Sequence, residues 1–231
     1  MKDIFKRMPL MASALLIAYS GSSYAIESDQ VDYYFALDGQ WHTVKLRPSW
    51  ETMFNNTAFG SNIAFGIRPS MYYGLEFGFE WTTRKTKTTT LANGATLAGL
   101  TNTSGGQLSI DSQLRMITTN ADVTGFLPLH ESWEALGYVG VGWARFKPKY
   151  NLSVPGTNFD TLHSLGSKTR SYLRVGLGVQ GLVTDTFGVR FKVGYNATGK
   201  VKFRYKDVQN TANDAPTESS YTIGLGGYFY V

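Results

Sequence analysis

Asp160, His163 and Ser164 place a carboxylate, an imidazole and a hydroxyl close together in the sequence. A serine activated by a histidine, which is itself oriented by an acid, is the arrangement that acyl transfer uses. Such triads are defined by geometry rather than adjacency, and these residue types are common in polar loops. The chain also has no Gly-x-Ser-x-Gly sequence. We therefore expect no catalytic residue.

The other histidines and the glycine-rich segments offer no further chemistry. His42 falls in an expected loop and His130 in an expected turn. The glycines of residues 224–227 belong to a strand pattern, and neither a helix nor a lysine follows them to make a phosphate loop. The chain has no cysteine, which excludes disulfides, thiolate nucleophiles and zinc–cysteine sites. We expect no metal and no cofactor.

Other charged residues recur at every second position within segments that are otherwise apolar. They number five acids and four bases, so they could pair on one face of a sheet. These residues form the expected interior charge network: Asp38, Arg68, Glu76, Glu80, Asp122, Glu134, Arg174, Arg190 and Lys192. The network either fills and stiffens an interior or provides a path for protons or ions, and we expect the first.

The elements that would hold these charges are eight strands with a period of two. They are expected at residues 31–41, 61–68, 72–81, 117–127, 134–144, 172–180, 187–195 and 221–231. Four long connections (42–59, 82–112, 146–168 and 197–220) alternate with three short ones (69–70, 128–132 and 183–186). This alternation predicts an all-β fold, an eight-stranded antiparallel up-and-down barrel, with solvated long loops at one end.

The direction of the apolar face decides between a membrane barrel and a soluble one. The polar face carries the nearly balanced charges and most strand glycines, which would make room in a narrow interior for Tyr34, Tyr138, Tyr172 and Tyr228. Aromatic residues gather near both ends of the apolar face, as in interface girdles. We therefore predict a transmembrane β-barrel; the alternative is a soluble lipocalin-like barrel or a β-sandwich.

The N-terminal segment and the composition agree with this prediction. Lys2, Lys6 and Arg7 precede an apolar stretch at residues 8–19, and small residues end at Ala25. This is the pattern of a bacterial signal peptide, expected at residues 1–25 and followed by a barrel domain at 26–231. Charged residues make up only 17% of the chain, which argues against disorder.

The chain resembles the small eight-stranded outer-membrane barrels of Gram-negative bacteria, the opacity and OmpX/Ail-like, porin-family proteins. The residues that carry the resemblance are the signal peptide, residues 120–122, residues 137–142 and the terminal alternation of residues 221–231, which ends in Val231 where the family usually has phenylalanine. The resemblance implies an integral protein of the cell outer membrane. It also implies the barrel-assembly machinery, outer-membrane lipid and lipopolysaccharide as partners.

The long connections carry an excess of basic residues, which predicts contacts with lipopolysaccharide phosphates or with host polyanions. The candidates are Arg84, Lys85, Lys87, Lys147, Lys149, Lys200, Lys202, Arg204 and Lys206. We expect a non-catalytic surface protein that supports membrane integrity and adhesion or host interaction, and that binds no nucleic acid. Two alternatives remain open: a narrow porin-like channel for small solutes, and a lipid-A-modifying hydrolase that uses Ser164.

Overall fold

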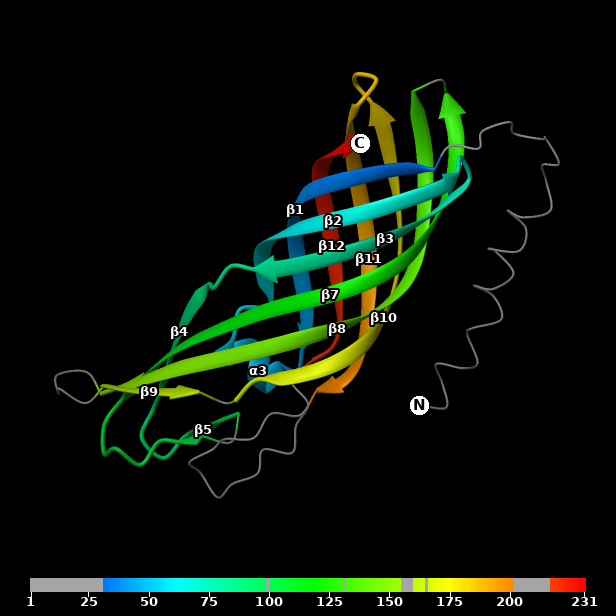
Figure 1. Ribbon diagram of the computed structural model, residues 1–231. Helices are drawn as coiled ribbons and strands as arrows, with labels where there is room; N and C mark the ends of the chain where they lie inside the picture. The colour runs from blue at the N-terminus through cyan, green and yellow to red at the C-terminus, as the bar shows by residue number, and fades with distance from the viewer. Residues whose placement is uncertain (1–30, 99, 131, 155–159, 165, 202–216) are drawn as a thin grey trace. The chain divides into compact units, whose positions relative to one another are not determined.

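The computed structural model describes residues 31–98, 100–130, 132–154, 160–164, 166–201 and 217–231. The expected signal peptide therefore lies outside the described residues. One antiparallel sheet dominates the described chain, and eight of its strands close into a ring in the order β7-β3-β2-β1-β12-β11-β10-β8, with β8 returning to β7 (Figure 1). The ring strands are β1 (Asp32–Leu46), β2 (Thr57–Ser70), β3 (Tyr73–Thr82), β7 (Leu108–His130), β8 (Trp133–Ser153), β10 (Lys168–Leu182), β11 (Phe187–Val201) and β12 (Thr217–Tyr230).

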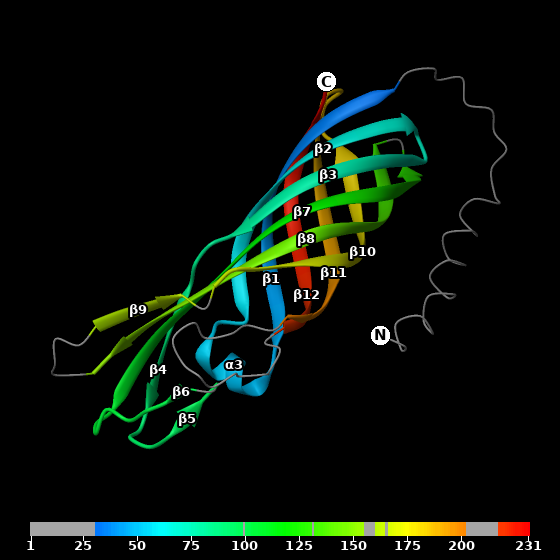
Figure 2. The same cartoon turned by 60° about the horizontal axis from the view of Figure 1, so that its bottom comes forward.

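The prediction of an eight-stranded antiparallel up-and-down barrel is confirmed. Each ring strand matches one of the eight expected segments to within one residue at the ends where it is shorter, and each pairs with its neighbours in the sequence except where β12 returns to β1. The short turns after β2, β7 and β10 lie at one end of the ring, which we call the turn end. The long connections lie at the other, which we call the loop end (Figures 1 and 2).

The apolar face of the sheet points outward, as predicted. Trp143, Leu177 and Leu225 are among the most exposed large apolar side chains, at 60%, 65% and 67%. In water such an apolar surface would cause aggregation, whereas the hydrocarbon chains of a membrane cover it without a free-energy penalty for exposing it to water. Outward aromatic side chains gather near both ends of the strands: Trp41, Trp143 and Tyr195 towards the loop end, and Tyr33, Tyr73 and Phe229 towards the turn end.

The inward face is polar and closely packed, and glycines make the space that its tyrosines occupy. A side chain at Gly66 would collide with the ring of Tyr34, and one at Gly188 would collide with the ring of Tyr228. Both tyrosines are buried. The expectation that strand glycines accommodate interior tyrosines is therefore correct at these positions. Among the described residues, no helix is long and apolar enough to cross a membrane.

The long connections differ from the solvated loops expected from the sequence. The first contains α3 (Pro48–Met53), and the second contains β4 (Thr86–Leu91), β5 (Thr96–Leu97) and β6 (Leu100–Thr101). The third contains the end of β8 and then β9 (Asp160–Ser164). β7 and β8 run on past the ring with β4 and β9 at their outer edges, and the four strands form a sheet that we call the projection (Figure 2).

Candidate functional site

The interior of the barrel holds a charge network in three clusters, and the nine predicted residues make it up. In the middle cluster, Arg190 donates from Nε and Nη2 to the two carboxylate oxygens of Asp38, each at 2.7 Å. Its Nη1 reaches Glu76 Oε2 at 2.6 Å, and Lys192 Nζ reaches Glu76 Oε1 at 2.6 Å. The side chain of Arg190 is only 1% exposed. One guanidinium therefore joins β11 to β1 and β3 across the lumen.

The second cluster lies nearer the loop end. Arg174 Nη1 donates to Glu80 Oε1 at 2.8 Å, and Arg174 Nε lies 3.6 Å from Asp122 Oδ1. Thr118 donates to the other oxygen of Glu80. Two carboxylates thus share one guanidinium.

The third cluster closes the turn end. Arg68 makes a two-bond pair with Glu134, each bond 2.7 Å long, and also donates to the hydroxyl of Tyr230. The Arg68 guanidinium also lies over the ring of Phe126, 4.1 Å from its centre. Gln180 donates to the same carboxylate of Glu134. The three clusters together connect strands from all sides of the ring, which favours a filled interior over an open channel.

Between the charge clusters and the loop end, the interior becomes apolar. Trp50, Met53 and Phe54, from α3 and the residue after it, are buried against Ile110 of β7 and Phe146 of β8. Leu91, Leu100 and Leu108 complete the same cluster, which we call the mouth core. The sequence analysis missed it, because it treated these segments as solvated loops.

The expected position of His42 is wrong, because β1 continues towards the mouth core. It was expected in a loop, but it lies in β1 and is fully buried in the interior. β1 continues because the alternation continues: Gln40, His42, Val44 and Leu46 all point inward. Only the polarity of the inward residues changes, and this change resembled the end of a strand.

The predicted basic residues occupy different places. Lys147 and Lys149 lie within β8 rather than in a loop, on the outward face of the projection. They share this face with two arginines that the sequence analysis missed, Arg115 directly opposite Lys147, and Arg145. We call Arg115, Arg145, Lys147 and Lys149 the basic band. The missed signal was the every-second-residue spacing from Trp143 to Lys149.

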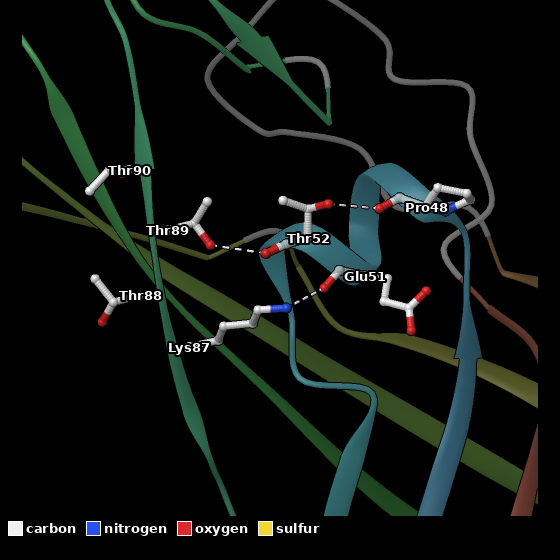
Figure 3. A pocket seen from close by; sticks show the side chains of 7 residues that line it. All are labelled: Pro48, Glu51, Thr52, Lys87, Thr88, Thr89 and Thr90. Atoms are coloured by element: carbon white, nitrogen blue, oxygen red, sulfur yellow. Dashed lines mark hydrogen bonds between the residues drawn. The ribbon is translucent and has the colours of Figure 1, made fainter.

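The remaining basic candidates do not join this band. Arg84 and Lys85 are exposed between β3 and β4. Lys87 lies in β4 on the opposite face, opposite the buried Ser112, and its Nζ donates to the backbone carbonyl of Glu51 (Figure 3). Its role as a contact for lipopolysaccharide or a host polyanion stays a prediction. Lys200 lies in β11 with its side chain outside the described part, and Lys202, Arg204 and Lys206 lie outside the described residues.

An open pocket separates α3 from β4. Its lining consists of Pro48, Glu51, Thr52, Lys87, Thr88, Thr89 and Thr90 (Figure 3). Thr89 donates to the carbonyl of Thr52, and Thr52 donates to that of Pro48. The first of these bonds fastens the helix to the projection, and the second lies within the helix.

The residues considered for acyl transfer lie in β9. Ser164 is opposite Lys149, His163 is opposite Tyr150 and Asp160 is opposite Ser153. Their side chains lie outside the described part of the chain.

Comparison with known proteins supplies the context for this geometry. No protein-family model matches the chain, and neither does any curated protein sequence. Among solved structures, a major outer membrane protein of Thermus thermophilus matches with a TM-score of 0.54 at 15% identity, over 87% of this chain and 99% of that one. The chain folds as an outer-membrane β-barrel.

Two further barrels are similar at lower scores. Neisserial surface protein A matches with a TM-score of 0.47 at 15% identity, over 87% of this chain and 98% of that one. The attachment invasion locus protein of Yersinia pestis, solved in complex with the heparin analogue sucrose octasulfate, matches at 0.44 and 13%, over 87% and 97%. At these identities the likeness concerns the fold of the barrel.

Proposed function

We propose that this barrel is a non-catalytic surface protein whose basic band binds the phosphates of outer-leaflet lipopolysaccharide and thereby reinforces the membrane around it. The observation that supports this is the order of outward residues along β8. Trp143 is 60% exposed, and Arg145, Lys147 and Lys149 follow on the same face. At about 3.3 Å per residue, Arg145 lies about 7 Å beyond the tryptophan, where head-group phosphates begin.

The basic band places cationic side chains opposite each other, which supports an anionic partner. Arg115 and Lys147 are directly opposite each other on neighbouring strands, and like charges in that position repel. Among the side chains that the structure describes, which leave out those of β9, no ion pair within 4 Å joins the band to a carboxylate. An external phosphate would turn this repulsion into charge-assisted hydrogen bonds.

The projection supports a second role, in adhesion or host interaction. β7 and β8 contain 23 and 21 residues, about twice the 9–11 that a transmembrane strand needs. β4 and β9 widen the part beyond the membrane. A broad, ordered surface held away from the bilayer suits contact with another cell, and host polyanions would use the same basic groups.

Two matched variants test whether the basic band binds anions. Arg115→Gln/Lys147→Gln removes two charges from the band, whereas Lys168→Gln/Arg170→Gln removes two exposed charges from β10 at positions opposite the inward-facing Phe146 and Ala144. We expect the first variant to bind phosphorylated lipopolysaccharide about thirtyfold more weakly, because each of the two charges near an anionic surface contributes about 1 kcal/mol. The control should bind normally.

The measurement is lipopolysaccharide bound per refolded barrel, with dephosphorylated lipid and heparin as separate arms. Equal binding by both variants, or undiminished binding of dephosphorylated lipid, would contradict the phosphate proposal. Binding of heparin in preference to lipopolysaccharide would favour adhesion.

The channel alternative has its own test. Because charge clusters and the mouth core fill the described interior, we expect no current steps in planar bilayers, and steady conductance would support the channel alternative instead.

A further inference from the structure

The outward surface of the projection beyond the basic band is polar wherever the structure describes its side chains. Each outward position carries a hydroxyl, an amide or a carboxylate, namely 86, 88 and 90 of β4, 109, 111 and 113 of β7, and 151 and 153 of β8. The alternate positions, such as Ile110 and Ser112, are buried on the other side of the sheet. The register forms rows across three strands, with Thr88 opposite Asp111 and Asp111 opposite Asn151. We call this surface the hydroxyl face.

Side chains of the hydroxyl face orient one another and leave acceptors for a ligand. Thr88 Oγ1 donates to Asp111 Oδ1 at 2.6 Å, and Gln113 Nε2 donates to Thr86 Oγ1 at 2.9 Å. Asp111 Oδ2 and Gln113 Oε1 have no hydrogen-bond partner among the described side chains. Both threonines are exposed, and Asp111 and Gln113 are half-buried. An external molecule therefore meets acceptors that are already held in position, which lowers the entropy cost of binding.

The chemistry of the hydroxyl face fits a saccharide better than a protein. Protein interfaces have apolar and aromatic side chains at their centre, and the described part of the hydroxyl face has neither. A sugar hydroxyl both donates and accepts hydrogen bonds, and carboxylate and amide oxygens accept the bonds that it donates. Rows of such oxygens therefore match a chain of sugar rings.

The position of the hydroxyl face selects one saccharide. Lys149 of the basic band lies directly opposite Gln113, so the band and the hydroxyl face are continuous. From Lys147 to Ser153 the surface extends about 20 Å, at about 3.3 Å per residue. In lipopolysaccharide the sugars next to the lipid carry phosphates, and the further sugars continue away from the membrane. A molecule whose phosphates bind the band would therefore have its oligosaccharide beside this face.

We propose that the hydroxyl face binds the core oligosaccharide of the same lipopolysaccharide molecule whose phosphates bind the basic band. This inference rests on the proposed function and extends it from the phosphates to the sugars. Uncharged hydrogen bonds that replace bonds to water contribute little each, so a sugar in solution would bind weakly. Phosphates held by the band raise the effective concentration of the attached sugars at the hydroxyl face. Asp111 Oδ2 and Gln113 Oε1 then accept hydrogen bonds from sugar hydroxyls.

The test measures binding of two lipids to the refolded barrel: lipopolysaccharide with its complete core, and lipid A, which keeps its phosphates but has no core sugars. We expect Asp111→Ala to bind the complete lipid about fivefold more weakly, as for the loss of one hydrogen bond. Its binding of lipid A should be unchanged or stronger. Electrostatics alone predicts stronger binding of both lipids, because a carboxylate near the band is removed.

Two further variants locate the effect. Gln113→Ala changes no charge, and it should also weaken binding of the complete lipid and leave lipid A unaffected. Glu51→Ala is the control, because Glu51 is an exposed carboxylate of α3, outside the hydroxyl face, that accepts a hydrogen bond from Asn56 as Asp111 does from Thr88. It should bind both lipids normally.

The outcomes separate this inference from the phosphate proposal. Arg115→Gln/Lys147→Gln is read on lipid A, where unchanged binding would contradict the phosphate proposal. The hydroxyl face is read on the difference between the two lipids. Equal changes for both lipids in Asp111→Ala, or stronger binding of the complete lipid, would overturn the inference. Core oligosaccharide released from its lipid that binds as tightly as the intact molecule would also overturn it, in favour of a glycan from outside the membrane.

Discussion

The lumen and part of the mouth core lie on the inward face of the same strands, yet the two regions are held together by opposite means. In the lumen, buried charges such as Arg190 and Glu76 pair across the ring. In the mouth core, apolar side chains such as Trp50 and Phe146 exclude water. The difference shows that a strand can change the chemistry of its inward face without a break in its backbone pattern.

The outward face changes in the opposite sense at nearly the same height. Along β8, outward Trp143 is followed by outward Arg145, while inward Gly142 and Ala144 lead to inward Phe146. Within the lipid the apolar side chains face out, and beyond it they face in. The surrounding solvent therefore decides which face is apolar, and the alternation of the strand persists through the change.

The largest predicted effect comes from the lumen. Arg190→Ala would leave Asp38 without its ion-pair partner and Glu76 with only Lys192. Losing one partner of a buried pair costs about 3–5 kcal/mol. We expect the free energy of unfolding of the refolded barrel in urea to fall by this amount. The folded fraction at each urea concentration is read from SDS electrophoresis without heating, in which the folded barrel has a different mobility from the unfolded chain. The control is Arg170→Ala, at an exposed arginine, which should change the free energy of unfolding by less than about 0.5 kcal/mol.

Removing a large side chain from the mouth core should act locally. Trp50→Ala would leave a cavity among Met53, Phe54 and their neighbours, which for a buried aromatic residue costs about 3–5 kcal/mol of local stability. We expect protease to cleave the segment of α3 much faster, while the barrel midpoint falls by less than it does in Arg190→Ala. Equal falls in the two variants would mean that lumen and mouth core unfold as one unit.

A smaller effect is expected at the turn end of the network. The Arg68 and Glu134 side chains are 10% and 15% exposed, so water reaches the charge that remains when its partner is removed. Arg68→Ala should therefore lower the free energy of unfolding by about 1–2 kcal/mol, less than Arg190→Ala. A loss as large as that of Arg190→Ala in the same urea titration would refute this gradient along the lumen.

The smallest effect is expected where α3 meets the projection. Lys87→Met keeps the length of the side chain and removes the hydrogen bond to the Glu51 carbonyl, which is worth about 1 kcal/mol. Hydrogen exchange in α3 should rise severalfold with no change in the barrel midpoint. Unchanged exchange would show that the mouth core alone positions the helix.

The barrel itself was predictable from the sequence because two constraints act on every strand within the membrane. Lipid requires apolar residues at every second position, as at Leu75, Phe77 and Phe79. The narrow lumen requires charges that pair and glycines that make room. Both constraints leave a period of two in the sequence, so the strands, their inward face and the charged residues of that face could be assigned before the structure was known.

The parts beyond the membrane were not predictable in the same way. The rule that apolar residues face outward fails where lipid ends, so His42, Val44 and Leu46 resembled a loop although β1 continues through them. α3 has six residues, too few to show a helical period. Arg115 was missed because its place opposite Lys147 depends on the register between β7 and β8, which a single sequence does not display. Arg145 does follow the alternation from Trp143 to Lys149, and it was missed because the strand was expected to end before it.

The continuous pairing of β7 with β8, from Ser109 opposite Ser153 to His130 opposite Trp133, has a mechanical consequence. A force on the tip of the projection is directed along these strands, while the hydrogen bonds that tie them to β3 and β10 run across it. Those bonds are strained together in shear rather than opened one after another. The same hairpin that reaches away from the cell is therefore also its anchor, and it would resist being pulled out of the bilayer.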